Sequence, residues 1–169
     1  MKLYQVFVGA LALVTLSGCA TLSPELQARY STSVEMALTT APDELKAAAD
    51  KGDGHAQLGY SFVLRYGLNG VPADPASADA YRARAVASRG TTTSAVYVPG
   101  YKRVPGHTQL LNVPQYDVNL TEADAAQDCA AVLAGTFAKD LADKKVQSGT
   151  CGGEAGFIRL QSLWAKAKH

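Results

Sequence analysis

The chain has 169 residues, of which 47% are hydrophobic, 18% charged and 8% aromatic. This composition excludes a disordered chain, and the length allows one globular domain with a buried core. The 16 basic residues nearly balance the 15 acidic ones, for a net charge of +1, so we expect no nucleic-acid partner, which would need clustered cations.

The first residues, 1–18, predict a signal peptide. Lys2 precedes an uncharged apolar stretch, residues 3–16. This stretch is shorter than the roughly 20 residues that cross a membrane as a helix. The run Leu16-Ser17-Gly18-Cys19 that follows resembles the lipobox of bacterial lipoproteins. The remainder, 19–169, is then expected to be the single mature domain.

The lipobox resemblance implies that the Cys19 thiol is acylated and becomes the first residue of the mature chain. Alanine rather than aspartate follows it at position 20. In bacteria with an outer membrane, this implies sorting to that membrane, with the domain facing the periplasm. The covalent lipid is the only non-protein group implied, and no other cofactor is expected. An ordinary signal peptide or anchor helix, with Cys19 incidental, is the alternative.

Two cysteines remain, Cys129 and Cys151. An even pair in an oxidising compartment predicts a disulfide, and two separate buried thiols are the alternative. No metal site is expected, because the cysteines and the histidines at 55, 107 and 169 lack the spacing of metal ligands.

The first half of the chain predicts helices separated by turn residues. Leu26, Tyr30, Val34 and Leu38 recur at four-residue steps, which places them on one helix face. Asp53 and the Asp74-Pro75 pair are typical of helix starts. The predicted helices span 24–38, 43–51, 54–66 and 75–89.

Small residues and glycines recur with a particular spacing across residues 45–90. They comprise the run from Ala48 to Gln57 and then Gly67, Gly70-Val71, Asp74, Ala78, Tyr81 and Ala85. This pattern resembles a Sel1-like repeat, a relative of the tetratricopeptide repeats. The resemblance implies an antiparallel helix pair and a role in protein–protein contacts.

The segment departs from the repeat pattern at several positions. Tyr60 and Ser61 stand where Leu-Gly is usual, and Leu64 and Tyr81 replace the usual Tyr and Trp. Only one unit is present, and a solenoid needs about three. We therefore expect the helix pair to pack on helix 24–38 on one side and on the C-terminal helices on the other.

Residues 91–118 are rich in β-branched and aromatic side chains and contain three prolines. Extended runs at 93–98 and 108–113 predict a β-hairpin across 99–107, whose prolines confine it to edge positions. An ordered irregular loop is the alternative. The predicted fold class is thus mostly α, with antiparallel Sel1-like or tetratricopeptide-like helix pairs and one irregular or hairpin insertion.

Residues 121–168 predict a C-terminal helical hairpin. Thr121-Glu122-Ala123-Asp124 resembles a capping box before a helix at 122–145. The apolar side of this helix carries Cys129, Leu133, Phe137 and Leu141, and Gly135 is a point where it kinks or splits. A last helix is predicted at 154–168.

The sequence contains no recognisable catalytic arrangement, so no catalytic residue is assigned. His55 is expected on a helix surface, and the acids Glu122, Asp124 and Asp128 are expected to compensate a helix dipole. His107 lacks an identifiable nucleophile and orienting acid.

The most unusual local feature is the run from Tyr97 to Gly106, where Tyr97, Tyr101, Lys102 and Arg103 lie among prolines and glycines. Rigid aromatic and basic side chains are typical of recognition surfaces. The partner would be a protein, a glycan or an anionic lipid surface; the alternative is a loop whose tyrosines pack over the helices.

These observations favour an acylated envelope lipoprotein that acts as a non-catalytic protein–protein adaptor through its Sel1-like repeat. Binding is expected in the groove between helices 54–66 and 75–89, bordered by 91–118. The alternatives are an enzyme that binds or hydrolyses cell-wall fragments or β-lactams, and a structural lipoprotein in contact with peptidoglycan. A deep pocket gathering Tyr101, Lys102, His107 and an acid would favour the enzyme.

Overall fold

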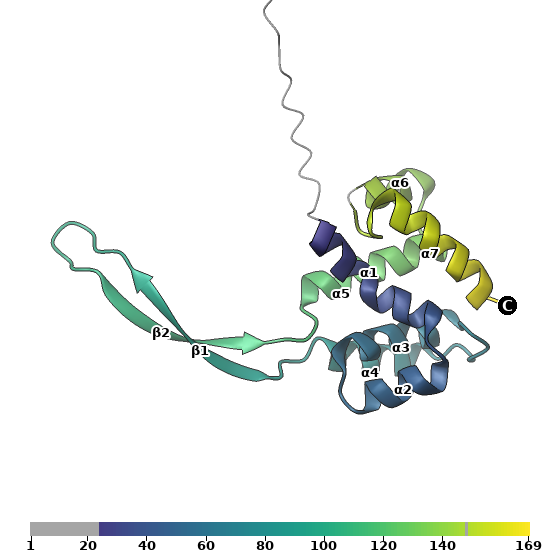
Figure 1. The fold of residues 1–169 in the computed structure, drawn as a ribbon, viewed down its shortest axis with the longest axis horizontal. Helices are drawn as coiled ribbons and strands as arrows, with labels where there is room; N and C mark the ends of the chain where they lie inside the picture. Colours follow the sequence, from purple (N-terminus) through teal and green to yellow (C-terminus); the bar gives the residue numbers. More distant parts are fainter. Residues whose placement is uncertain (1–23, 148) are drawn as a thin grey trace, which may run out of the picture.

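The fold is mostly helical with one two-stranded antiparallel sheet (Figure 1). The computed structural model describes residues 24–147 and 149–169. Its elements are α1 (Pro24–Thr39), α2 (Pro42–Asp50), α3 (Gly54–Tyr66), α4 (Pro75–Ala85), β1 (Gly90–Val98), β2 (His107–Gln115), α5 (Leu120–Leu133), α6 (Lys139–Gln147) and α7 (Gly153–Ala167). The mostly helical class and the hairpin in the second half are confirmed. Within the described ranges, every helix falls short of the length and hydropathy of a membrane span.

Helix α3 is the centre of the helical body, which comprises all seven described helices. Ten of its 13 residues are buried, because its sequence is apolar or small nearly all the way round. Helices α1, α2 and α4 all pack on it. Leu45, Leu58, Phe62 and Leu68 are among the largest fully buried side chains, so the core surrounds α3.

Helix α1 lies between this core and the C-terminal helices (Figure 1). It packs on α3 on one side and on α5 and α7 on the other. Its buried residues include the small Ser31, Ser33 and Ala37, which allow neighbouring helices to approach closely. The C-terminal helices therefore pack mainly on α1, and the expected arrangement on the opposite side of the helix pair is wrong.

The helix starts expected in the first half are present. The Asp53 side chain accepts a hydrogen bond from the Ala56 N–H at 2.8 Å, and Asp74 accepts one from the Ser77 N–H at 3.1 Å. Helix α4 ends at Ala85 rather than near residue 89. The residues after it turn into the hairpin, where the Arg89 N–H donates to the Gln115 carbonyl at 2.8 Å.

Residues 90–116, called the arm below, project from the helical body as a long hairpin (Figure 1). Its strands pair in register from Gly90 opposite Gln115 to Val98 opposite His107. Each strand has nine residues, so the paired part extends about 30 Å. The strands are longer than expected, and β2 includes Pro114, which an edge strand tolerates.

The helix expected at 122–145 is two helices, α5 and α6. Gly135 has φ of +70°, and the Thr136 N–H donates back to the Ala131 carbonyl, which ends α5 in a left-handed turn. The break redirects the chain, so Leu141 is exposed rather than on a continuous apolar side. The helix also begins earlier than expected, because Asn119 is its N-cap.

Cys129 of α5 and Cys151, in the turn before α7, are joined by a disulfide with a Cα–Cα distance of 5.1 Å. Both cysteines are fully buried. The link holds the start of α7 against α5. Farther along α7, Trp164 meets Tyr66 of α3 edge to face with ring centroids 5.2 Å apart, and burial raises the pKa of Tyr66.

Candidate functional site

The four residues expected to contact a partner, Tyr97, Tyr101, Lys102 and Arg103, gather at the far end of the arm. We call residues 97–106 the tip head. Tyr101 and Val104 exchange two backbone hydrogen bonds, each of 3.1 Å, around a turn whose corners are Lys102 and Arg103. The structure therefore brings all four residues together, and it places the tyrosines away from the helices.

The tip head is folded tightly on itself. A Cβ atom at Gly100 would lie 2.6 Å from both the Gly106 nitrogen and the Val104 carbonyl oxygen. A Cβ atom at Gly106 would overlap the Tyr97 ring, which lies across this glycine. The approach at Gly100 is to backbone atoms, which cannot move aside, so only glycine fits there and it favours a compact tip head.

Lys102 occupies a backbone conformation that usually belongs to glycine. Its φ is +55°, at the first corner of the two-residue turn. A side chain there costs about 1 kcal/mol relative to glycine. The Lys102 ammonium lies 5.3 Å from the centroid of the Tyr101 ring, so the cation is held over an aromatic face. The two-residue turn between Tyr101 and Val104 imposes this conformation.

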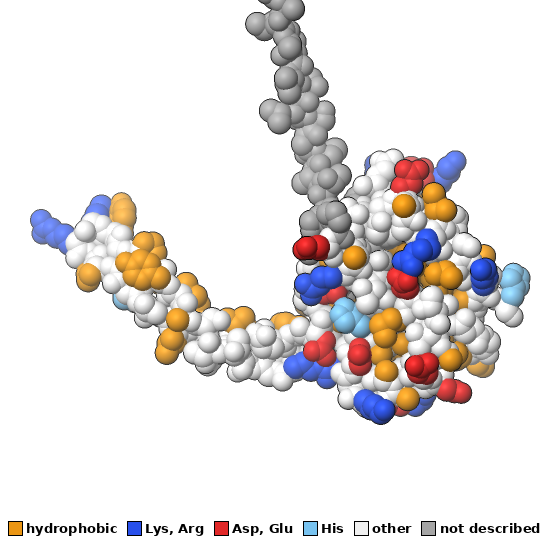
Figure 2. All heavy atoms as spheres, in the orientation of Figure 1, with side chains coloured by type: hydrophobic (Ala, Val, Ile, Leu, Met, Phe, Trp, Pro, Cys, Tyr) orange, Lys and Arg blue, Asp and Glu red, His pale blue; other side chains and the backbone are white. Residues whose placement is uncertain are grey.

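The tip head is the positive end of an otherwise uncharged arm. Lys102 and Arg103 are the only charged residues from Gly90 to Tyr116. Figure 2 shows both basic side chains at the end of the arm and hydrophobic side chains along its length. Tyr97, Tyr101 and Val104 are 66%, 73% and 65% exposed. The surface is thus cationic, aromatic and accessible.

The facing sides of α3 and α4, where a binding groove was expected, are packed against each other. Tyr60 and Tyr81 meet edge to face with ring centroids 4.9 Å apart, and burial raises the pKa of Tyr60. The Tyr81 hydroxyl donates to Asp50 at 2.7 Å. Hydrogen bonds from Lys46 and then Tyr81 lower the pKa of Asp50. None of the three cavities described below is lined by α3 or α4.

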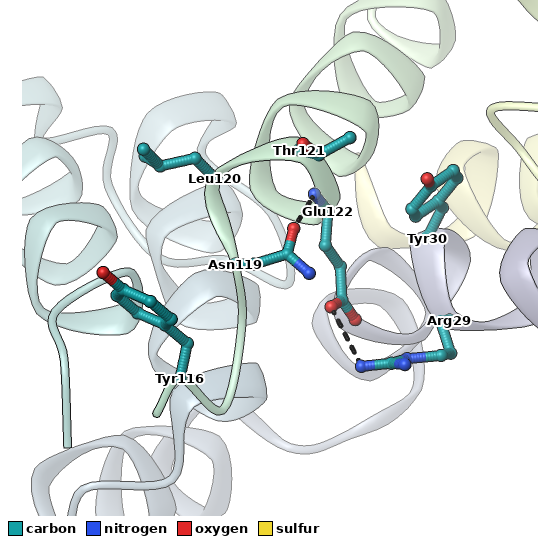
Figure 3. A pocket seen from close by; sticks show the side chains of 7 residues that line it. All are labelled: Arg29, Tyr30, Tyr116, Asn119, Leu120, Thr121 and Glu122. Atoms are coloured by element: carbon teal, nitrogen blue, oxygen red, sulfur yellow. Dashed lines mark hydrogen bonds and ion pairs between the residues drawn. The ribbon is translucent and has the colours of Figure 1, made fainter. Parts of the chain in front are cut away.

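A cavity of about 440 Å³ opens at the base of the arm, between α1 and the start of α5 (Figure 3). Its lining residues are Arg29, Tyr30, Tyr116, Asn119, Leu120, Thr121 and Glu122. The Asn119 side chain accepts a hydrogen bond from the Glu122 N–H at 2.9 Å. The Glu122 carboxylate, only 3% exposed, reaches toward Arg29 with an Oε2–Nη2 distance of 3.4 Å.

Glu122 belongs to a polar cluster that joins three helices. His55 Nε2 lies 3.8 Å from Glu122 Oε1, and His55 Nδ1 lies 3.2 Å from the Ser33 hydroxyl. Serine, histidine and carboxylate are the residue types of nucleophilic catalysis. Ser33 is only 2% exposed, however, and it lines none of the three cavities. The cluster therefore ties α1, α3 and α5 together.

Sequence reasoning missed this cluster. Glu122 was expected to serve the helix start, but Asn119 has that role and Glu122 is buried between helices. His55 was expected on the surface, and it is half-buried against α1. A glutamate in the first turn of a helix is the ordinary helix-start pattern, so no local pattern indicated that Glu122 is buried.

Two further cavities, of about 660 and 350 Å³, lie between α1 and the C-terminal helices. Gln27 lines both. Beside the smaller one, Glu35 of α1 forms an ion pair with Arg159 of α7. The hydrogen bond from Arg159 lowers the pKa of Glu35. The Glu35–Arg159 ion pair links α7 to α1.

The residues expected to gather in an enzyme pocket do not line any of the three described cavities. His107 is exposed at the start of β2, opposite Val98, and lines none of these cavities, nor do Tyr101 and Lys102. Residues 24–147 and 149–169 contain no group of three or more side chains arranged to hold a metal ion. The signal peptide (1–18) and Cys19 lie outside the described residues.

Comparisons with protein-family models, curated proteins and solved structures found no match for this chain. Functional inference therefore rests on its own residues.

Proposed function

We propose that the protein is an acylated lipoprotein of the bacterial outer membrane and that it acts as a non-catalytic adaptor in the periplasm. Its partner is another envelope protein, bound through the tip head. The observation that carries the proposal is the rigid, exposed, cationic and aromatic end of the arm. Tyrosine and arginine are enriched among the residues that dominate protein–protein binding energy.

The helical body supports this proposal as a scaffold. Residues 45–90 contain the helix pair α3 and α4, and buried Ala78 and Ala85 let the two helices approach closely. This pairing agrees with a Sel1-like unit, a family that generally mediates protein contacts. In our proposal the repeat supports the arm, and the arm supplies the binding surface in place of the groove between the helices.

The predicted lipid anchor near the N-terminus is consistent with the same proposal. Acylation at the lipobox-like run would put the lipid on Cys19, which precedes the start of α1 at Pro24 by a few residues of sequence. Acylation at more than one position gives stable membrane attachment. The domain would then be held at the membrane while the arm extends from it, which suits contact with another envelope component.

Site-specific photocrosslinking in cells tests the binding surface. A photoreactive phenylalanine analogue replaces Tyr101 in one strain and Tyr116, an exposed tyrosine at the base of the arm, in a control strain. We expect one discrete envelope-protein adduct from position 101 and none from 116. The adduct should be lost when Lys102→Glu and Arg103→Glu are added. Equal crosslinking from both positions, or an adduct indifferent to the charge reversal, would contradict the proposal.

The anchor is tested separately with a palmitate label. Wild type should take up the label and fractionate with the outer membrane. The Cys19→Ala variant should remain unlabelled and carry an uncleaved signal peptide. A labelled Cys19→Ala protein would show that the anchor lies elsewhere.

A further inference from the structure

We propose that the cavity at the base of the arm binds a saccharide. Glu122 and Arg29 would hydrogen-bond its hydroxyl groups, and Tyr30 and Tyr116 would pack against its ring. This inference goes beyond the proposed function, because it gives a ligand to the base of the arm rather than to the tip head. It does not depend on the identity of the envelope protein.

The first argument is that the protein does not satisfy the buried Glu122 carboxylate. In residues 24–147 and 149–169, Oε1 has no hydrogen-bond partner, and His55 Nε2 at 3.8 Å is beyond hydrogen-bond distance. The 3.4 Å contact between Oε2 and Arg29 is long for a hydrogen bond between charged groups. A buried polar atom without a partner is costly, and a ligand is one explanation for it. The carboxylate can therefore accept further hydrogen bonds.

The second argument is that the start of α5 does not need this carboxylate. Asn119 already caps the helix by accepting a hydrogen bond from the Glu122 N–H at 2.9 Å. The Glu122 side chain instead extends toward Arg29 of α1 (Figure 3). Packing of α5 on α1 thus brings a nearly buried carboxylate, 3% exposed, to the wall of the cavity.

The charges of the cavity favour a neutral ligand with hydroxyl groups. Its lining includes one cation and one anion, Arg29 and Glu122. A cationic ligand would face the guanidinium and an anionic ligand would face the buried carboxylate, so either would meet a like charge. A hydroxyl group can donate to a carboxylate and accept from a guanidinium at the same time. Neighbouring hydroxyls of a sugar ring therefore match the pair better than a charged group does.

The aromatic residues of the cavity favour a ring as well. Tyr30 of α1 and Tyr116 at the end of the arm lie on either side of Glu122 (Figure 3). Tyr30 is half-buried and Tyr116 is 48% exposed, so both offer surface to a ligand. A tyrosine has an apolar face that can pack on the C–H groups of a sugar, and a hydroxyl that can hydrogen-bond to it. The exposed Leu120 adds an apolar rim.

The size and opening of the cavity suit a short stretch of glycan. Its volume of about 440 Å³ lies within the range of about 300–1,000 Å³ that is typical of small-molecule sites. Asn119 and Thr121, which also line it, are exposed, so the cavity is open to the surface. An open site can receive a ring within a longer glycan as well as a free oligosaccharide.

Isothermal titration calorimetry of the full acylated chain tests this proposal. The protein is held in lauryldimethylamine oxide micelles, because this detergent carries no sugar that could compete. The probes are triacetylchitotriose and cellotriose, which share the same linked rings and differ in their acetamido groups. We expect saturable binding. Binding of triacetylchitotriose alone would show that the acetamido group is recognised, and binding of both would show that the ring is sufficient. No binding of either sugar overturns the proposal.

Variants with matched controls show whether the cavity is the site. Glu122→Gln and Tyr116→Ala should each weaken binding by about tenfold or more, as expected for a lost hydrogen bond to a charged group or a lost ring contact. Glu44→Gln on α2 and Leu110→Ala on β2 are exposed controls that should bind like wild type.

Thermal unfolding with and without sugar separates binding from folding. The sugar should raise the melting temperature of wild type and of both controls, because it binds the folded state. It should leave the melting temperatures of Glu122→Gln and Tyr116→Ala nearly unchanged. Cavity variants that bind as tightly as wild type, or controls that lose binding equally, would place the sugar elsewhere and overturn the proposal.

Discussion

The helical body and the arm place their apolar side chains in opposite environments. In the body, leucine, phenylalanine and alanine side chains cover one another around α3, and a few polar side chains such as Glu122 are buried with them. In the arm, valine, leucine and tyrosine face water along strands that carry no charge. The comparison shows that the body can be stable by its own burial, whereas the surface of the arm is suited to contacts with other molecules.

The largest predicted difference between the body and the arm is the loss of stability when a large apolar side chain is truncated to alanine. Phe62→Ala in α3 should lower the free energy of unfolding by about 3–5 kcal/mol, since the ring is only 1% exposed and leaves a cavity. Leu110→Ala in β2, where the side chain is 68% exposed, should change it by less than about 0.5 kcal/mol. Urea denaturation of the full chain measures both losses. Similar losses of unfolding free energy for the two variants would contradict the difference drawn between the body and the arm.

The disulfide should contribute the next largest effect, and only to the body. Replacing both Cys129 and Cys151 by serine should lower the free energy of unfolding by about 2–5 kcal/mol, because the unfolded chain regains its freedom. Thermal unfolding with and without reductant measures this loss. Reductant should destabilise wild type and leave the double variant unchanged. A double variant as stable as oxidised wild type would contradict the expectation.

The polar cluster around Glu122 predicts that truncating Arg29 lowers stability more than truncating Arg103, an effect smaller than that of the disulfide. Arg29→Ala should cost about 1–3 kcal/mol, because the buried Glu122 carboxylate loses its nearest cation. Arg103→Ala in the tip head removes the same side chain from an exposed turn and should leave stability unchanged. Chemical denaturation of the two variants in parallel checks this. Equal effects would show that Arg29 does not stabilise Glu122.

The smallest predicted effect is a pH dependence that belongs to the body alone. Arg159 lowers the pKa of Glu35 from its ordinary value of 4.5. A carboxyl group whose pKa is lowered on folding stabilises the fold above its unfolded pKa and loses that contribution as pH falls through its folded pKa. Wild type should therefore lose stability below pH 4.5 slightly more steeply than Glu35→Gln.

Urea titrations at several pH values measure these slopes, and Glu44→Gln, an exposed carboxyl of α2, is the control. A Glu35→Gln slope as steep as that of wild type would show that the pair with Arg159 does not contribute.

The helices of the first half could be predicted because their signals are local. Asp53 and Asp74 are short polar residues directly before predicted helices. Both accept the expected N-cap hydrogen bond in the structure. The hairpin was predictable from β-branched residues between prolines, but its length was not. Gly90 and Pro114 have weak strand preference, yet both are paired in the ladder at the arm base, where Arg89 also pairs with Asp117.

Of the two candidate sites, the tip head could be predicted from the sequence and the polar cluster around Glu122 could not. The tip head was found from composition alone, since aromatic and basic residues among prolines and glycines are unusual. The cluster of Glu122, His55 and Arg29 was not found, because its members are far apart in sequence and meet only when α1, α3 and α5 pack. The split at Gly135 was foreseen as one option, but the exposure of Leu141 depends on the direction of the chain after the break.

Hydrogen exchange of the full chain tests most directly whether the body and the arm differ in stability. Because the core surrounds α3, its amides should be strongly protected. Because the strands of the arm are exposed and form a two-stranded sheet, amides of β1 should exchange much faster than those of α3. Protection of β1 equal to that of α3 would contradict the account.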